Sequence, residues 1–290
     1  MERVNGSEVG GELAFAISIA HRAGRLLCGL FDQRHTVGRK SSEIDLVTEA
    51  DIASERLIVD AIHSRFPDHL ILAEEGLGDL LPQSVTPQSP ALTQQGDSRA
   101  RVGERGLWIV DPLDGTVNYA HRYPVWGVSI ALAVGGRVEV AVSHDPLRGE
   151  TYWAERRRGA WCNGRRLKVS EVARLGEALL ATGFPYSLAT ARENNLAEFN
   201  AVMPRVHGVR RAGAAVLDLA HVAAGRLDGY WELWLNPWDW AAGWLLVEEA
   251  GGAVTDMDGQ PWSLNSSKIV ASNGCLHAEL LDALKGARRP

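Results

Sequence analysis

Cysteine is scarce in this sequence. Its 290 residues include three, Cys28, Cys162 and Cys275, which are widely spaced and form no CxxC pair. Three such cysteines cannot build an even disulfide framework. A reducing compartment is the simplest setting for this cysteine usage, so we expect a cytoplasmic location.

We also expect no segment that directs the chain to a membrane. No basic region followed by a signal-type apolar stretch stands near Met1, and we expect no apolar run of membrane-spanning length. Basic residues are outnumbered, and the formal net charge of −6 argues against a nucleic-acid partner. The same charge repels a phosphorylated substrate, so an enzyme for such a substrate would need a metal ion to reverse the local field.

Several catalytic signatures are missing as well. The chain has no GxxxxGK[ST] loop for nucleotide phosphates and no GxSxG turn for a serine nucleophile. Its nine histidines form neither an HExxH nor an HxH cluster, which disfavours a zinc hydrolase. The acidic residues therefore carry most of the functional signal.

What is present is an ordinary globular balance, with 46% hydrophobic and 23% charged residues. A chain of this length predicts one large domain or two closely packed ones. We expect an N-terminal α+β half over residues 1–147 and a C-terminal α/β half over residues 148–290, packed as one compact unit. Alternation and helical periodicity predict helices near residues 8–31, 48–65, 215–224 and 237–249 and a β-hairpin over 125–143.

The segment from Gly76 to Gly106 differs from the rest in composition. Pro82, Pro87 and Pro90 alternate there with serine, threonine, glutamine and glycine, and apolar periodicity is lost. This pattern predicts a long loop. The loop is either a surface insertion without a role or a lid, because it connects two segments that carry acidic residues.

One run of residues carries the strongest functional signal, Trp108 to Thr116, which reads WIVDPLDGT. An apolar strand there ends in Asp111 and Asp114, three residues apart, and Gly115 follows. Glycine allows close backbone approach, and a helix opening at Thr116 would offer free N–H groups to phosphate. The pattern indicates either magnesium-assisted phosphoryl chemistry or, more simply, an acidic turn after a strand.

Other carboxylates stand at the ends of predicted elements. Glu74 follows a short apolar strand, Asp51 lies at the start of a helix, and Asp239 opens another. Each aspartate has a simpler interpretation as a helix cap, Asp51 answering Thr48 and Asp239 answering Asn236. Taken together, however, the acids are what a site with several magnesium ions requires, because Mg²⁺ prefers oxygen ligands and two ions can share a carboxylate.

These segments resemble the inositol monophosphatase family. The resemblance is carried by Glu74-Glu75, by DPLDGTVN from Asp111, by Trp238-Asp239, and by the run from Arg210 to Gly252. It extends over nearly the whole chain, with the proline-rich loop as the main departure, and is strongest to bacterial inositol-1-monophosphatases. It implies a mixed α/β fold, an αβαβα layered sandwich of the sugar-phosphatase type.

The resemblance also implies an activity and a metal site. The family consists of Mg²⁺-dependent, often lithium-sensitive phosphomonoesterases, and inositol-1-phosphate is the first-choice substrate here. Glu74, Asp111 and the carbonyl of Leu113 would hold one metal ion, and Asp111, Asp114 and Asp239 a second. Glu74 would also face a weaker third ion through water, and it counts among the catalytic residues.

Further roles follow from the same resemblance for the water and the phosphate. The backbone N–H groups of Gly115 and Thr116 would receive the phosphate. Thr116, paired with Asp51, would orient and deprotonate the attacking water. No covalent phosphoenzyme is needed.

The expected substrate pocket is built from the second half of the chain. Glu232 stands seven residues before Asp239 and matches the position that recognises substrate hydroxyls, while Gly213 and Ala215 would line the same pocket. Lys40 is either a basic contact near the site or a solvated loop lysine. Residue 214 is alanine where a hydroxyl residue is usual, which puts one substrate hydrogen bond in doubt.

Alternatives stay open at three points. The tryptophans at 231, 234, 238, 240 and 244 are either core or part of a dimer face, and the family suggests a homodimer. The chemistry could also serve fructose-1,6-bisphosphate, histidinol phosphate or 3′-phosphoadenosine 5′-phosphate. A regulatory protein that keeps the fold as a binding surface for the transcription machinery is a further alternative, which the intact acid set disfavours.

Overall fold

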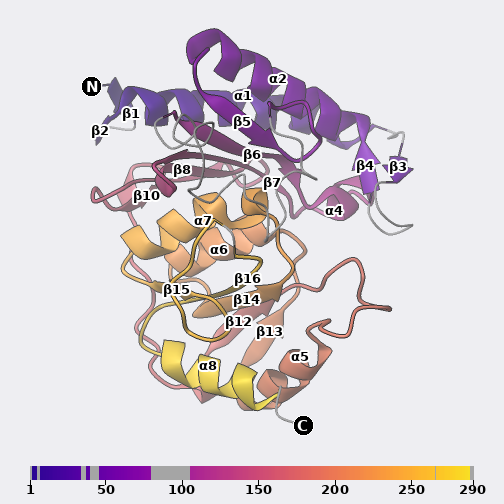
Figure 1. The fold of residues 1–290 in the computed structure, drawn as a ribbon, viewed down its shortest axis with the longest axis vertical. Coiled ribbons are helices and arrows are strands. Elements are labelled where there is room, and N and C mark those ends of the chain that lie inside the picture. Colours follow the sequence, from indigo (N-terminus) through magenta and orange to yellow (C-terminus); the bar gives the residue numbers. More distant parts are fainter. Residues whose placement is uncertain are drawn as a thin grey trace, which may run out of the picture.

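The computed structural model describes residues 2–4, 7–33, 37–39, 46–79, 105–264 and 266–287. Figure 1 shows these residues in alternating layers of helices and sheets, with two helices at the top, a large sheet below them, a second pair of helices, a smaller sheet and a last helical layer. The predicted mixed α/β layered sandwich is confirmed. The loop prediction for residues 76–106 falls mostly on positions outside the described residues, as does the prediction for Lys40.

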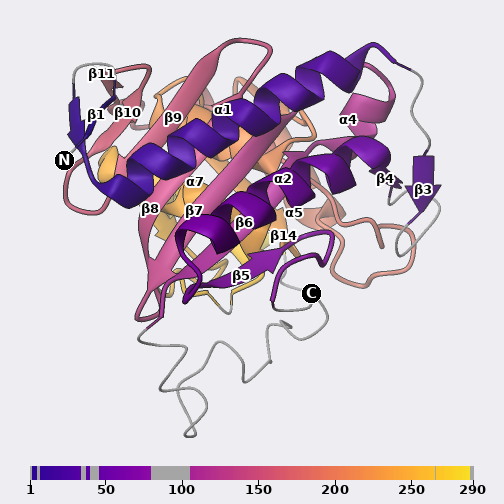
Figure 2. The same ribbon diagram turned by 90° about the horizontal axis from the view of Figure 1, so that it is seen from above.

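The top layer consists of α1 (Gly11–Phe31) and α2 (Glu49–Arg65), which lie side by side over one face of the large sheet (Figure 2). Their apolar residues, Leu13, Ile17, Leu27 and Ile58 among them, are fully or almost fully buried against it. By length and composition alone α1 could cross a membrane, with a mean hydropathy of 1.3 over 18 residues, which corrects our expectation that no run approaches that length. Half of that window is buried inside the fold, as in the core helix of a layered protein.

The large sheet has seven strands in the order β11-β10-β9-β8-β7-β6-β5. β5 and β6 are parallel and the remaining neighbours are antiparallel, including the predicted hairpin of β7 and β8. The sheet crosses residue 147, at which we divided the sequence, and the division itself stays a prediction. Its strands are β5 (Leu70–Ala73), β6 (Leu107–Asp114), β7 (Gly127–Val134), β8 (Arg137–Asp145), β9 (Glu150–Glu155), β10 (Ala160–Cys162) and β11 (Arg165–Arg166).

The middle layer is formed by α6 (Ala215–Ala223) and α7 (Pro237–Glu249), which lie between the two sheets (Figure 1). One apolar cluster runs from Ile109 in the large sheet through these helices to Ile269 in the smaller one. The helices touch closely at Gly243, where a Cβ atom would lie 2.5 Å from the side chain of Leu219. This tight packing fixes α7, and with it Asp239, relative to α6.

The smaller sheet has five strands in the order β13-β12-β14-β16-β15, and α5 and α8 cover its outer face. β12 is parallel to β13 and β14, while β16 is antiparallel to both of its neighbours. The elements are β12 (Leu179–Thr182), β13 (Gly208–Arg210), β14 (Gly229–Leu233), β15 (Ala253–Thr255), β16 (Lys268–Ser272), α5 (Leu196–Val202) and α8 (His277–Gly286). The remaining short elements are β1 (Glu2–Val4), β2 (Ser7–Val9), β3 (Val37–Arg39), β4 (Leu46–Thr48), α4 (Thr116–Ala120) and the 3₁₀ turns Leu175–Glu177 and Met203–Arg205.

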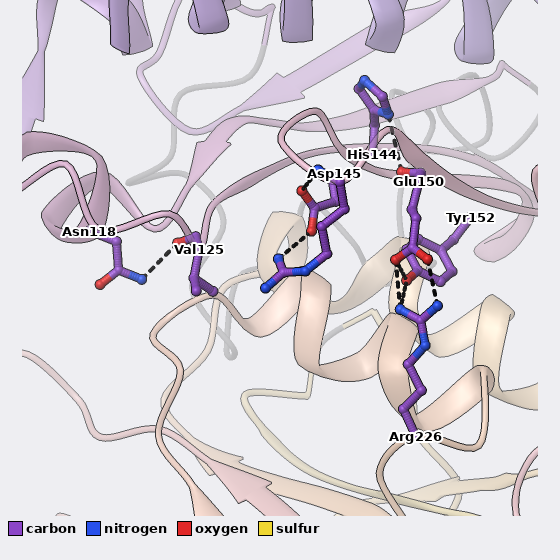
Figure 3. Close-up of polar contacts among 8 residues, drawn as sticks. Asn118, Val125, His144, Asp145, Glu150, Tyr152 and Arg226 are labelled. Carbon is purple, nitrogen blue, oxygen red and sulfur yellow. Dashed lines mark hydrogen bonds and ion pairs between the residues drawn. The ribbon is translucent and has the colours of Figure 1, made fainter. Parts of the chain in front are cut away.

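A polar cluster joins the segment after α6 in the middle layer to the start of β9 in the large sheet. Arg226, just beyond α6, donates two hydrogen bonds of 2.5 and 2.6 Å to the Glu150 carboxylate, and the Tyr152 hydroxyl donates a third of 2.6 Å (Figure 3). These bonds lower the pKa of Glu150 to about 2. The carboxylate therefore stays charged and keeps the two layers joined over the whole physiological pH range.

The tryptophan-rich segment is mostly core, as one of its two interpretations predicts. Trp231 and Trp240 are fully buried, and Trp238 and Trp244 are 5% and 8% exposed. Trp234 is the exception, because it is 44% exposed. No partner chain is present, so the alternative of a dimer face stays a prediction.

Candidate active site

A cavity of about 330 Å³ lies where the end of β6 meets the starts of α6 and α7 and the end of β14. Ten of the twelve residues that the sequence analysis assigns to the site line it. These ten are Glu74, Asp111, Leu113, Asp114, Gly115, Thr116, Gly213, Ala215, Glu232 and Asp239. Asp51 lies directly behind Thr116, and Lys40 falls outside the described residues. The structure thus gathers residues from 74 to 239 around one space.

An irregularity in β6 aims both of its carboxylates into the cavity. Along the strand Ile109 faces the middle helices and Val110 faces α1 and α2. Strict alternation would place Asp111 and Asp114, three positions apart, on opposite faces. The register with β7 shifts between these two residues, Leu113 is buried beneath α1 and α2, and both aspartates line the cavity. Bulges of this kind often re-aim side chains beside active sites.

The turn after the strand is held from several directions. Gly115 has a φ of +91°, and a Cβ atom there would lie 2.9 Å from the carbonyl oxygen of Val125, so the position requires glycine. Asn118, one turn further on, donates to the carbonyl of Val125 at 2.7 Å and to that of Ala212 at 2.9 Å (the first of these bonds appears in Figure 3). Asn118 therefore ties the turn to the loop that carries Gly213, a role that the sequence analysis did not assign.

Asp51 serves both as a helix cap and as the partner of Thr116. One carboxylate oxygen accepts hydrogen bonds from the backbone N–H and the hydroxyl of Thr48, at 2.8 and 2.6 Å, which completes the predicted capping box. The other accepts the Thr116 hydroxyl at 2.8 Å. Burial raises the pKa of Asp51 from its usual value, while these hydrogen bonds oppose the shift. The same carboxylate thus caps α2 and contacts Thr116, and its role in catalysis stays a prediction.

The turn that carries Glu74 rests on a buried acid that sequence reasoning missed. Glu55 in α2 has no exposed surface, and its carboxylate accepts the backbone N–H groups of Glu75 and Leu77 at 2.6 and 2.7 Å. These bonds hold the turn beside Asp111. A charged residue on the buried face of a predicted helix was the available sequence signal, because such residues are rarely buried without partners.

Helix starts hold the remaining two acids. Asp114 accepts the backbone N–H of Val216 in the first turn of α6 at 2.8 Å, and Asp239 accepts the N–H of Asn236 at 2.6 Å. Both bonds satisfy donors that a helix start leaves unpaired. Asp239 therefore both caps the start of α7 and lines the cavity.

The cavity is strongly acidic. Six carboxyl side chains line it against a single basic one, Arg211, among the described residues. Burial, followed by the charge of Glu74, raises the pKa of Asp111 and of Asp239 well above the usual range, and burial raises that of Asp114 to about 8. So many acids cannot ionise together in this space unless a cation accompanies them.

The donor set fits a hard divalent cation such as Mg²⁺. Carboxylate oxygens and the Leu113 carbonyl are the ligand type that Mg²⁺ prefers, and the cavity leaves room for water ligands. Among the described residues, no three acidic, histidine or cysteine side chains already stand as a closed metal-binding group. The acids would therefore have to draw together around an ion.

The opposite side of the cavity is built from the smaller sheet. Glu232 accepts the hydroxyl of Tyr230, and burial raises the pKa of Glu232 to about 7. A Cβ atom on Gly183 would overlap the Glu232 carboxylate at 2.2 Å, so this glycine makes room for it. Asp218 and Arg211 also line the cavity, although the sequence analysis did not assign them, because a carboxylate within a predicted helix gave no distinct signal.

Comparison with known proteins supports the class that this fold and site suggest. The sequence model of the inositol monophosphatase family matches residues 12–289. An inositol-1-monophosphatase of Synechocystis is 41% identical over 272 residues, which cover 94% of this chain and 88% of the relative. The Nus factor SuhB of Pseudomonas aeruginosa is 41% identical over 276 residues, 94% of this chain and 95% of the relative. The solved structure of inositol monophosphatase from Anabaena (Nostoc) superposes with a TM-score of 0.79 at 40% identity, covering 95% of both chains.

The layered fold and the acid-lined cavity are those of a phosphatase that acts on small phosphate esters. With a family match over nearly its whole length, the chain belongs to the inositol monophosphatase family. It is an enzyme of the phosphatase class.

Proposed function

We propose that this protein is a Mg²⁺-dependent phosphomonoesterase that hydrolyses a sugar or cyclitol phosphate, with inositol-1-phosphate as the first-choice substrate. The observation that carries the proposal is the convergence of Glu74, Asp111, Asp114 and Asp239 on one cavity that Glu232 also lines. The name of the Synechocystis relative supports the substrate. Lithium sensitivity, a homodimer and a cytoplasmic location belong to the same proposal.

The chain's own residues would divide the work as follows. The Thr116 hydroxyl donates a hydrogen bond to Asp51, so its oxygen keeps lone pairs that can accept a proton from the attacking water. As the Thr116 oxygen accepts that proton, its own hydroxyl proton would pass to Asp51, whose pKa burial raises. The N–H groups of Gly115 and Thr116 would receive the phosphate, and Glu232 would accept hydroxyls of the leaving group.

Glu74, Asp111, Asp114, Asp239 and the Leu113 carbonyl would hold the metal ions. When bound, Mg²⁺ supplies positive charge to the phosphoryl oxygens and favours the ionisation of water at neutral pH. Without such charge the cavity would repel the phosphate, because six carboxyl groups face one guanidinium among the described lining residues.

The direct test is phosphate release from a panel of phosphomonoesters, with and without Mg²⁺ and with added Li⁺. The panel contains inositol-1-phosphate, fructose-1,6-bisphosphate, histidinol phosphate and 3′-phosphoadenosine 5′-phosphate. We expect turnover of inositol-1-phosphate that requires Mg²⁺ and is lowered by Li⁺. Preference for another compound of the panel would make that compound the assigned substrate. No turnover of any compound by folded protein would favour a binding role.

The metal assignment also predicts how stability depends on pH. A carboxyl with a raised folded-state pKa holds its proton to higher pH than the unfolded chain does. Its stabilising contribution is therefore complete below the unfolded pKa of about 4 and is lost as the pH rises through the folded value, about 8 for Asp114 and about 7 for Glu232. The metal-free protein should lose stability from this source between pH 4 and 8, and Mg²⁺ should restore it.

Melting temperatures with Mg²⁺ and with a chelator, at pH 5.5 and pH 8, measure this effect. The rise caused by saturating Mg²⁺ should be about 5 °C or more at pH 8 and clearly smaller at pH 5.5. The quantity to compare is the rise caused by Mg²⁺ at each pH, and not the melting temperature itself. Burial lowers the pKa of His144 and His221 to about 4, so these residues change the melting temperature with the opposite sign over part of the range. A Mg²⁺ effect that is equal at both pH values would contradict the assignment.

A further inference from the structure

Trp234 lines the cavity and has a backbone conformation that is unusual for its residue type. Its φ is +65°, in the left-handed region that favours glycine, and its side chain is 44% exposed. Such a conformation costs about 1 kcal/mol or more for a bulky residue, and it persists where the surroundings hold it. The strain calls for an explanation, because burial of the indole does not supply one.

Two neighbours fix the indole. Its Nε1–H donates to the carbonyl of Glu193 at 2.8 Å, and the ammonium of Lys268 lies 4.5 Å from the ring centroid. Lys268 also pairs with the Glu193 carboxylate at 2.7 Å. The ring is therefore tied to the segment before α5 and to β16, with the Lys268 ammonium on one of its faces.

Trp234 is one of the residues that line the cavity. Trp234 and Tyr186, which is 49% exposed, both line the cavity. Glu232 lies two residues before Trp234 and lines the same cavity from the end of β14. A carboxylate that can accept hydroxyls and an aromatic side chain thus line the same cavity.

We propose that Trp234 is a specificity-determining residue that stacks against the leaving group, so that the enzyme prefers phosphomonoesters of a hydroxylated ring, a cyclitol or a pyranose, over acyclic ones. Such a ring presents C–H groups on its faces, which suit the electron-rich face of an indole, and hydroxyls at its edge, which suit Glu232. The inference rests on the proposed phosphatase function and deepens it. Trp234 would act on the part of the substrate that does not react.

Three substrates separate the two contributions. Inositol-1-phosphate has a ring and hydroxyls, cyclohexyl phosphate has a ring alone, and glycerol 2-phosphate has hydroxyls alone. In the presence of Mg²⁺, Trp234→Gly should lower kcat/KM about five- to tenfold for the two ring substrates and leave glycerol 2-phosphate unchanged. Glu232→Gln should lower kcat/KM more for inositol-1-phosphate and glycerol 2-phosphate than for cyclohexyl phosphate.

The glycine variant is a favourable probe, because glycine adopts this backbone conformation without strain. Arg157→Gly is the matched control: Arg157 is exposed, has the same φ of +65° and lies far from the cavity in the chain. It should leave all three kcat/KM values unchanged. Trp234→Phe, which keeps an aromatic face on the same backbone, should retain most of the preference for rings.

The outcomes are distinct. An inactive wild-type protein on all three substrates would overturn the proposed function together with this inference. An active wild type whose Trp234→Gly variant keeps the same ratio of ring to acyclic kcat/KM would overturn the inference alone. A uniform loss on all three substrates would assign Trp234 to general access or structure, and would also overturn it.

Discussion

Replacement of Asp111 by asparagine is expected to lower Mg²⁺-dependent kcat/KM by about a thousandfold or more. The reason is that the proposed shared ligand of two ions would lose its charge, and a loss of about 4 kcal/mol of transition-state stabilisation corresponds to that factor. The amide oxygen can still accept the Leu113 N–H, which now donates to the carboxylate at 3.1 Å. The local fold should therefore persist.

Stability should change in the opposite direction. Burial raises the pKa of Asp111 well above the usual range, so ionisation of this residue opposes folding in metal-free protein at pH 8. The Asp111→Asn variant should melt at the same temperature as metal-free wild type or higher, and it should lose the rise caused by Mg²⁺. Thermal melts with and without the ion measure both effects.

Asp145→Asn is the matched control. Asp145 (Figure 3) is also buried at the end of a strand of the large sheet, but its carboxylate pairs with Arg148 at 2.7 Å, and it is not among the residues that line the cavity. This variant should lose about 1–3 kcal/mol of stability and keep its activity. Near-normal turnover of Asp111→Asn in Mg²⁺ would show that the metal assignment is wrong.

Removal of the Thr116 hydroxyl is the second change with a large expected effect. Thr116→Val keeps the shape of the side chain but removes the group that we propose accepts a proton from water. We expect kcat to fall about 10²- to 10⁴-fold, the usual range for general acid–base groups, with KM changed little. Steady-state kinetics on inositol-1-phosphate at saturating Mg²⁺ measures the two constants separately.

Two further variants separate this role from helix capping. Thr116→Ser restores a hydroxyl and should recover most of kcat. Thr48→Ala removes the cap of α2, at a cost of about 1 kcal/mol, and should leave kcat within a few-fold of wild type because the Asp51–Thr116 hydrogen bond remains. If Thr116→Val keeps kcat within threefold, this pair does not deprotonate the attacking water.

Much of the fold could be predicted from local patterns. The capping box at Thr48 and Asp51, the helix start at Asn236 and Pro237, and the hairpin of β7 and β8 all appear where the sequence placed them. Each depends on interactions within a few residues, so short windows of sequence suffice. The apolar character of α1 was harder to interpret, because a core helix and a membrane-spanning one share length and composition.

Most of the candidate site was predicted too, but by residue type and family resemblance. The acids at 74, 111, 114 and 239 are chemically conspicuous in the sequence. Their supports were missed, namely Glu55 beneath the Glu74 turn and Asn118 across to Ala212. The Asn118 bond spans 94 residues of sequence, and no local pattern announces such a partner.

Residue identity and motif order, which need no folding, were enough to predict the carboxylate donors and the family. The directions in which those groups point depend on the folded chain. A shift of register in β6 turns Asp111 and Asp114 toward the same cavity, although alternation predicts opposite faces. The folded structure also leaves Trp234 exposed while four tryptophans nearby in the sequence are buried. Strand ends and neighbouring segments determine this exposure, and residue type does not.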